Sequence, residues 1–477
     1  MVFNSFSCAI FLLLVWPLYW LGRGMRWRQS LLIAASLVFY GWWDWRFVPL
    51  MLVVSLIAWA GPLLRERALK AGRPALAKAA FVTAIALPLT GLAFFKYTLF
   101  LLQVLADGAA WAGITFAAPK WHIPLPVGIS FYCFHAISYV VDAAKGKSTV
   151  ERSYARVLLY IAFFPQLVAG PIVRSSDFLP QLLADRVLVA AEFVEGLRKM
   201  LFGLTMKVVF SDALAHWADA VFNDPARFTL AARWAGALAF YGQIYFDFAG
   251  YSLIAIGLSQ TLGYRLPANF NVPYISRSVT EFWRRWHISL SSWLRDYLFI
   301  PLGGNRSHYT RNLMITMMLG GLWHGASWNY LLWGTLHGLA LVVHKLWTTH
   351  CGQALERWQG LSVARARTSI FAAWLLTQFF VVLCWVPFRC KEWSHTLTFF
   401  TTKASVPEPL TEPVSPITWT WLLVPLVVDA YLQTRKAPGP EQSGRPAWVL
   451  GAGYAVLFIV ILALGTWDSK AFIYFQF

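Results

Sequence analysis

The sequence predicts an all-α, polytopic integral membrane protein, and three observations support this fold class. Of the 477 residues, 58% are hydrophobic and only 13% are charged, whereas soluble domains carry about 25% charged residues. Long apolar segments recur along the chain, each close to the ~20 residues that a helix needs to cross ~30 Å of hydrocarbon. Lysine and arginine cluster in short loops between these segments, which is the pattern of cytoplasmic loops.

The apolar segments lie at approximately 5–21, 30–43, 47–64, 80–105, 126–143, 157–173, 200–222, 230–262, 312–323, 327–348, 368–388, 418–433 and 447–466. We expect about ten to twelve spans in one multi-pass domain over residues 1–477. Proline and glycine in 126–143 and 157–173 favour broken or re-entrant elements, and 230–262 is too long for one simple crossing.

Charge predicts the orientation of the chain. No basic residue precedes the first apolar segment, and Arg23, Arg26 and Arg28 follow it, so we expect a retained first segment with the N-terminus outside. The basic loops predicted to be cytoplasmic are 65–78, 144–156, 284–311, 345–367 and 434–446, and the acidic, proline-rich linker 403–417 is predicted to be periplasmic.

Composition also argues against other classes of protein. The formal net charge is +18, but the sequence contains no recognisable nucleic-acid-binding module. The five cysteines are scattered without metal-ligand spacing and resemble buried apolar residues. We therefore expect neither nucleic acid nor a metal site, and any chemistry must take place within or beside the helix bundle.

The stretch Glu281–His337 places polar residues inside apolar sequence. Ser278 and Glu281 have the spacing of a capping box, which predicts a helix start. One face of that helix would carry His287, and the opposite face would carry Arg284, Arg285 and Arg295. We interpret it as an amphipathic helix at the membrane boundary, with a neutral, proton-accepting His287 on the apolar side.

Each of these residues also has a structural interpretation. His287 could simply bond a buried carbonyl, and the arginines could anchor the membrane surface. His324 lies between two apolar segments, flanked by glycines that would let a ligand or another backbone approach closely. It could take a proton from an attacking hydroxyl, whereas the glycines could equally serve helix packing.

Three further ionisable residues lie in apolar sequence. Asp247 must pair with a partner, for which an arginine or a histidine ring N–H is suitable, and a structural ion pair is the favoured role. His337 and His344 are seven residues apart on one helical face. Without a third donor they are weak metal ligands, and we favour packing for both.

These residues stand within motifs that carry a resemblance. The motifs are Pro126–Tyr132, Val168–Arg174, Tyr245–Ser252, Glu281–Leu290, Trp293–Leu298, Gly321–Ala326 and Phe472–Phe477. In this order and spacing, over nearly the whole chain, the sequence resembles the membrane-bound O-acyltransferase superfamily, most closely its alginate O-acetylation branch. The resemblance implies a bundle of broken and interfacial helices around a central tunnel, with the catalytic region at about residues 240–345.

The resemblance also implies the site. The family's catalytic histidine corresponds to His324, and its second polar site residue corresponds to His287. The donor would be acetyl-CoA as a substrate, with no permanently bound cofactor. Residues assigned to the donor's phosphates and pantetheine arm are Arg284, Arg285, Arg295, Arg306 and Trp323, with Arg311 beside them. Residues expected to line the site are Tyr245, Asp247, Trp286 and Asn305.

By the same resemblance, the chain would act in the bacterial inner membrane with a periplasmic SGNH-hydrolase-like partner that passes acetyl groups to hydroxyls of an exported polysaccharide. Alginate, cellulose and peptidoglycan remain open as acceptors, and transfer of D-alanine to teichoic acid is a more distant alternative. A non-catalytic transporter or channel for an acyl donor or polymer is the competing hypothesis, since glycine-rich broken helices and Asp247 would suit it too.

Overall fold

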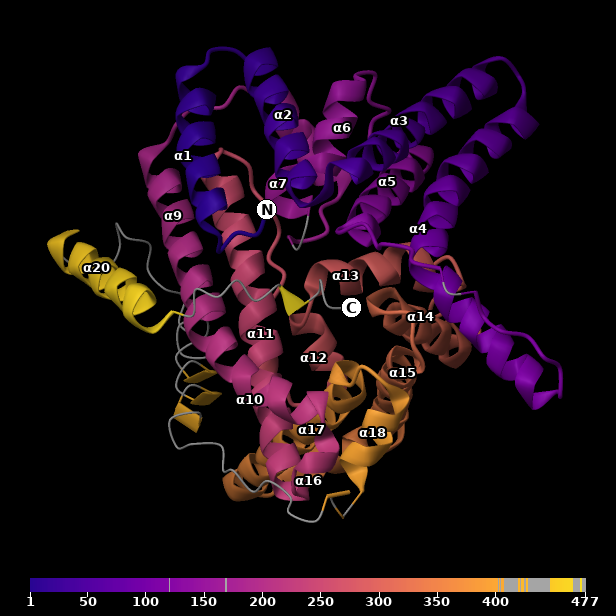
Figure 1. Cartoon of the computed structure of the whole chain (residues 1–477), viewed down its shortest axis with the longest axis vertical. Coiled ribbons are helices and arrows are strands. Elements are labelled where there is room, and N and C mark those ends of the chain that lie inside the picture. The colour runs from indigo at the N-terminus through magenta and orange to yellow at the C-terminus, as the bar shows by residue number, and fades with distance from the viewer. Residues whose placement is uncertain are drawn as a thin grey trace. The chain divides into compact units, whose positions relative to one another are not determined.

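The described part of the computed structural model is built of helices and the segments that connect them (Figure 1). It describes residues 1–119, 121–167, 170–401, 403, 405–406, 419–420, 422–423, 426–427, 447–465 and 472–473. Several predicted features lie outside the described residues. These are Val168 and Ala169 of the second motif, most of linker 403–417 and of segment 418–433, loop 434–446, residue 466 and the last four residues.

The chain divides into two compact units. The N-terminal unit comprises Met1–Met200 and Ser252–Pro267, and the C-terminal unit comprises Leu201–Tyr251 and Ala268–Phe477. Two helices contribute residues to both units, namely α9 (Ala190–Leu204) and α11 (Leu230–Thr261). The predicted long segment 230–262 therefore forms one continuous helix.

In the N-terminal unit, α3 (Val48–Lys70) and α4 (Pro74–Trp111) form a long helical hairpin, and α5 (Ile129–Ala144) packs against both of these helices. The helices of this unit are α1 (Phe6–Leu21), α2 (Met25–Asp44), η1 (Trp45–Phe47), α3 (Val48–Lys70), α4 (Pro74–Trp111), α5 (Ile129–Ala144), α6 (Tyr154–Ala162), α7 (Phe164–Leu167) and α8 (Ser175–Leu183). The indoles of Trp16 and Trp20 donate to the side-chain and main-chain oxygens of Thr261, which holds α1 against the end of α11.

The predicted broken elements are only partly confirmed. Segment 157–173 is broken, because α6 ends at Ala162 and the four-residue α7 follows. Segment 126–143 instead forms the unbroken helix α5, which begins after Gly128. Gly128 has a φ of 75° and approaches the carbonyl oxygen of Leu167 so closely that a Cβ there would be crowded, so glycine is required at this start.

The C-terminal unit contains the predicted catalytic region apart from residues 252–267. Its helices, besides parts of α9 and α11, are η2 (Thr205–Ser211), α10 (Asp212–Asn223), η3 (Pro225–Arg227), η4 (Pro273–Ile275), α12 (Val279–Arg285), α13 (Ile288–Leu294), η5 (Arg295–Phe299), α14 (Tyr309–His324), α15 (Trp328–His350), α16 (Gly352–Gly360), α17 (Val363–Arg389), α18 (Trp393–Phe400) and α20 (Ala447–Leu464). Here α14 and α15 form a hairpin, against which α12 and α17 pack through α15 (Figure 1).

Several helices have the length and composition needed to cross a membrane. Among the described residues, Met25–Lys70, Pro74–Trp111 and Val363–Arg389 are long and apolar enough, and Phe6–Leu21, Ile129–Ala144 and Gly451–Leu464 are shorter apolar helices. The chain is thus a multi-pass helical membrane protein. The expectation of ten to twelve spans stays a prediction.

Candidate active site

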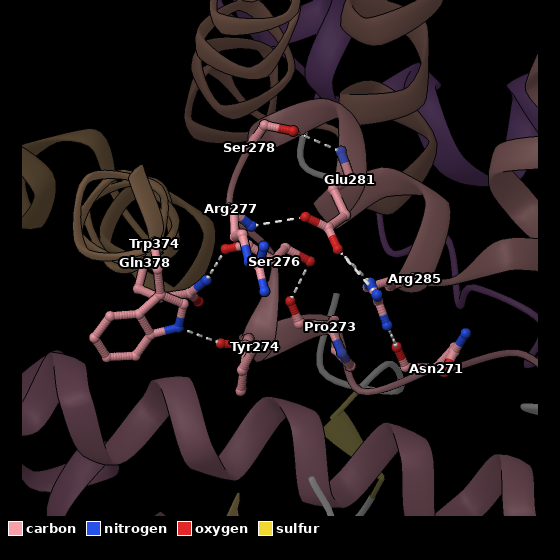
Figure 2. Close-up of polar contacts among 10 residues, drawn as sticks. All are labelled: Asn271, Pro273, Tyr274, Ser276, Arg277, Ser278, Glu281, Arg285, Trp374 and Gln378. Atoms are coloured by element: carbon pink, nitrogen blue, oxygen red, sulfur yellow. Dashed lines mark hydrogen bonds and ion pairs between the residues drawn. The ribbon is translucent and has the colours of Figure 1, made fainter. Parts of the chain in front are cut away.

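Helix α12 starts where the sequence predicted. The Oγ atom of Ser278 accepts a hydrogen bond from the backbone N–H of Glu281 at 3.1 Å (Figure 2). The carboxylate of Glu281 reaches back to the N–H of Arg277 rather than to that of Ser278, and it also forms an ion pair with Arg285 at 2.9 Å. Arg285 donates in turn to the carbonyl oxygen of Asn271. These bonds fix α12 to the loop before it.

Two side chains of α17 hold that loop in place. The Trp374 indole donates to the carbonyl oxygen of Tyr274 at 2.9 Å, and the Gln378 amide donates to that of Ser276 at 2.8 Å (Figure 2). The Oε1 atom of Gln378 also accepts from the Tyr241 hydroxyl at 2.8 Å. The start of α12 is therefore positioned by helices far from it in the sequence.

The prediction of one continuous amphipathic helix from Ser278 onward is wrong. Helix α12 ends at Arg285, His287 adopts a left-handed conformation with φ of 41°, and α13 begins at Ile288. A left-handed non-glycine residue costs free energy and persists only where its surroundings hold it. The predicted burial is nevertheless confirmed, since His287 is fully buried and Arg284 is exposed.

Asn269 supplies the bonds that hold this strained turn. Its Oδ1 atom lies 3.1 Å from His287 Nδ1 and accepts from the Ser289 hydroxyl at 2.8 Å. Its main-chain oxygen accepts from the Ile288 N–H at 2.9 Å. Because an amide oxygen can only accept, Nδ1 of His287 is the protonated nitrogen, and Nε2 is the proton-accepting one.

We expect Asn269→Ala to lower acyl transfer about 10- to 100-fold, because the neutral ring would lose the bond that fixes its tautomer and orientation. Asn271→Ala is the matched control, since the structure assigns a bond to the Asn271 main-chain oxygen, which alanine retains. Transfer rates of folded protein, compared by size-exclusion profile, check the result. Equal rates for the two variants would contradict a positioning role for Asn269.

The surroundings of His287 are apolar and aromatic. The Phe248 ring lies edge-on at 4.6 Å between centroids, and the Trp323 ring lies at 6.0 Å. His287 connects two seven-residue helices, each too short to span a membrane. A charged imidazolium is disfavoured in such apolar surroundings, so they favour the neutral ring.

His324 is the last residue of α14 and is only 3% exposed. Its ring lies 5.0 Å from that of Trp333 and 5.1 Å from that of Phe388. Gly321 and Gly325 contact Tyr330 so closely that neither position has room for a Cβ. The packing role considered for these glycines is confirmed, and it is what brings the end of α14 against α15.

The indole of Trp323 contacts both histidines. Its ring lies 4.9 Å from that of His324 and 6.0 Å from that of His287. The two histidines, 37 residues apart in the sequence (324 − 287), therefore face one shared, buried aromatic side chain. This arrangement places both imidazoles around the same indole, in one buried region of the C-terminal unit.

Two predicted site-lining residues form the aromatic shell around this centre. Trp286 packs on Phe270 at 5.1 Å and on Trp385 at 5.1 Å, and Tyr245 lies 6.3 Å from Trp286. Phe270 in turn lies 6.5 Å from the His287 ring. Tyr245 and Trp286 are fully buried, so they support the histidine rather than present a surface to solvent.

Asp247 forms the predicted structural ion pair, but with a different partner. Lys207 lies 2.7 Å from Asp247 and 2.8 Å from Asp212, all three side chains being 2% exposed. The predicted arginine or histidine partner is therefore wrong. The other carboxylate oxygen of Asp247 accepts from the N–H of Ile473 at 2.7 Å. The adjacent Phe248 contacts His287, so this charge cluster anchors the part of α11 that lines the site.

Lys207 lies in η2, a π-helical turn, which is a feature often found at functional sites. The backbone of α11 can approach this turn because Gly250 contacts the carbonyl oxygen of Gly203, where a Cβ would not fit without movement. A lone lysine within the apolar segment 200–222 was a signal in the sequence that could have identified the partner of Asp247.

The favoured packing role of His337 is consistent with its contacts. Its Nδ1 atom accepts from the Trp283 indole at 3.3 Å, and its ring lies 4.7 Å from that of Trp333. His344 Nδ1 lies 2.9 Å from the Thr280 hydroxyl. Among the described residues, no group of three or more His, Cys, Asp and Glu side chains is arranged to hold a metal ion.

The arginines assigned to the donor do not share one environment. Arg284 and Arg306 are exposed, as is Asn305, the residue expected to line the site. Arg295 is exposed but pairs with Asp296 at 2.8 Å, and Arg285 is engaged by Glu281. Arg284 and Arg306 are therefore the cations best suited to bind a negatively charged ligand. Arg285 has a structural role through its ion pair with Glu281.

Asn269 is the site residue that sequence reasoning missed. It stands in a loop 18 residues before His287, and no spacing rule links it to the histidine. Its role follows only from the fold, which brings the loop beneath the turn between α12 and α13.

Two buried imidazoles thus pack around one indole within a multi-pass helical membrane protein. Residues 129–386 match the membrane-bound O-acyltransferase family, and the chain belongs to this family. It is an O-acyltransferase.

The curated relatives have more particular names. The chain is 40% identical over 396 residues to the probable alginate O-acetylase AlgI of Pseudomonas aeruginosa, covering 81% of this chain and 72% of the relative. It is 33% identical over 395 residues to the peptidoglycan O-acetyltransferase of Helicobacter pylori, covering 77% and 72%. It is 30% identical over 249 residues to the teichoic acid D-alanyltransferase of Bacillus subtilis, covering 49% and 60%.

Proposed function

We propose that this O-acyltransferase takes acetyl groups from cytosolic acetyl-CoA and passes them outward, through a periplasmic partner, to hydroxyls of an exported polysaccharide. The observation that carries the proposal is the contact of His324 and His287 with the single indole of Trp323. The relatives named as alginate and peptidoglycan O-acetylating enzymes support acetyl as the group and a polysaccharide as the final acceptor. Coverage of the D-alanyltransferase is smaller, which favours acetyl over D-alanyl transfer.

The chemistry follows from a neutral imidazole in an apolar setting. His324 takes the proton of the acceptor hydroxyl while its oxygen attacks the thioester carbonyl. The new C–O bond forms, the C–S bond breaks, and the thiolate of coenzyme A leaves with the proton returned by the imidazolium. His287 Nε2, oriented through Asn269, is suited to hold the acceptor hydroxyl beside His324. Burial keeps water from competing for the acetyl group.

The donor would approach along the basic loop 284–311. The exposed guanidinium groups of Arg284 and Arg306 can bind phosphate oxygens in two-point contacts. In this proposal the pantetheine arm extends through a central tunnel past Trp323 to His324. A periplasmic SGNH-hydrolase-like partner would receive the acetyl group, with the chain in a bacterial inner membrane and its N-terminus outside.

Sealed membrane vesicles with the cytoplasmic face outward, prepared so that the periplasmic partner and the polysaccharide are enclosed in the lumen, test this function directly. Radiolabelled acetyl-CoA is added outside, and acetyl esters, identified by their release with hydroxylamine, are measured inside. We expect labelled esters in the lumen only when the protein is present, and none in vesicles of the opposite orientation. Labelling equal to that of vesicles without the protein, or labelling only in the opposite orientation, would contradict the proposal.

The cationic residues give a second measurable expectation. Arg284→Gln combined with Arg306→Gln should raise the KM for acetyl-CoA about 3- to 10-fold with little change in kcat, because exposed phosphate contacts contribute to donor binding alone. Arg365→Gln combined with Arg367→Gln, exposed arginines at the start of α17, is the control. An unchanged KM in the first double variant would remove these two residues from the donor site.

A further inference from the structure

A groove runs between the two arms of the α3–α4 hairpin in the N-terminal unit. It has a volume of about 550 Å³, and apart from Arg67, Arg73 and Thr83 its lining side chains are all apolar. Small residues form much of its floor, and a Cβ at Gly61 would collide with that of Ala84. Because these side chains are small, they leave the groove open between α3 and α4. Both helices have the composition of a membrane span.

The groove has the length of a lipid chain and its headgroup region. Its lining extends from Ile57 to Ala71 on α3 and from Arg73 to Leu87 on α4. Fourteen residues of helix rise ~21 Å, and one leaflet of the hydrocarbon core is ~15 Å thick, half of ~30 Å. One end of the groove is thus apolar at membrane depth, and the other end reaches the turn between the two helices.

The charged end of the groove is cationic. Arg67 and Arg73 line it, both are exposed, and no carboxylate lines the groove. The nearby Glu66 forms ion pairs with Lys70 at 2.7 Å and with Arg152 at 2.6 Å, so these two cations neutralise its negative charge. Helix α4 begins at Pro74 beside Arg73, and a helix N-terminus adds partial positive charge there.

We propose that this groove binds one anionic phospholipid, with the phosphate at Arg67 and Arg73 and an acyl chain along the small-residue floor. The ligand must carry negative charge at one end and an apolar tail at the other, which is the chemistry of such a lipid. Only 11% of the most apolar window of α4 is buried within the chain, so the bilayer is what surrounds this helix. The site is separate from the acyl-transfer chemistry and does not depend on the donor.

Native mass spectrometry of the full-length protein tests the headgroup contacts. Protein purified in detergent is titrated with phosphatidylglycerol and, separately, with phosphatidylethanolamine. We expect Arg67→Gln combined with Arg73→Gln to weaken phosphatidylglycerol binding roughly 10- to 30-fold. Lys145→Gln combined with Lys147→Gln removes the same charge from two exposed lysines of another loop and should leave the affinity within about twofold.

A second pair of variants tests the apolar part of the groove. Ala79 lines the groove and is exposed, so the larger ring of Ala79→Phe would obstruct the groove, and we expect it to abolish phosphatidylglycerol binding there. Ala86 is exposed on the same helix but does not line the groove, so Ala86→Phe should bind lipid as the wild type does.

Three results would overturn the proposal. The first is equal affinity for phosphatidylglycerol and phosphatidylethanolamine. The second is equal retention of lipid by the arginine and lysine double variants. The third is phosphatidylglycerol binding that survives Ala79→Phe. Copurification of a second protein at this face in place of a lipid counts as the same result.

Discussion

Replacing His324 with alanine is expected to lower the rate of acyl transfer about 10²–10⁴-fold, the contribution of a positioned general base. The ring lies against Trp323, Trp333 and Phe388 at the end of α14, and no other residue of that helix end can accept a proton. The measurement is ester formation in the vesicle assay, with the amount of folded protein matched between samples.

Two controls separate lost chemistry from lost structure. His324→Gln keeps a side chain of similar size with hydrogen-bonding groups but cannot act as a base at neutral pH, so it should be as inactive as the alanine variant. His350→Ala changes an exposed histidine at the end of α15 and should keep wild-type activity. Transfer by His324→Gln at the wild-type rate would exclude the general-base role.

Replacing Lys207 with methionine is expected to have the largest effect on stability, about 3–5 kcal/mol. The lysine is the buried cation between Asp212 and Asp247, and its removal leaves two carboxylates in an apolar interior without that partner. The expected result is a large fall in the temperature at which the detergent-solubilised protein loses its monodisperse size-exclusion peak.

The compensating variant makes this prediction specific. In Lys207→Met combined with Asp212→Asn and Asp247→Asn, all three charges are removed, so much of the stability should return. Lys199→Met is the matched control, because Lys199 is 30% exposed in its side chain and its pairing with Glu195 is a surface contact worth less than about 1 kcal/mol. Equal melting of the Lys207 and Lys199 variants would show that the buried cluster contributes little.

The acyl-transfer site and the charge cluster are linked through α11. Asp247 binds Lys207 and the backbone of Ile473, and the next residue, Phe248, packs against His287. The buried ion pair therefore supports the histidine through two adjacent residues of α11. Polar groups of this kind are costly inside a membrane protein, and here they hold the residue that packs against the candidate site histidine.

Periodicity and charge were sufficient to predict most of the long apolar helices, the start of α12 at Ser278, and the burial of His287 against the exposure of Arg284. They predict these features because helix capping and amphipathicity depend on residues three or four positions apart. They could not predict that the helix breaks at His287. That break is held by Asn269, 18 residues away, and local propensity contains no information about such a bond.

The amino-acid sequence by itself determined that this is a multi-pass helical protein with ionisable residues at membrane depth, since hydrophobic length and charge placement are properties of each segment alone. Only the tertiary structure decided that His287 and His324 share one indole and that Lys207 rather than an arginine neutralises Asp247. These pairings join residues of different helices or choose among several nearby charges, and such choices are made by packing geometry rather than by spacing along the chain.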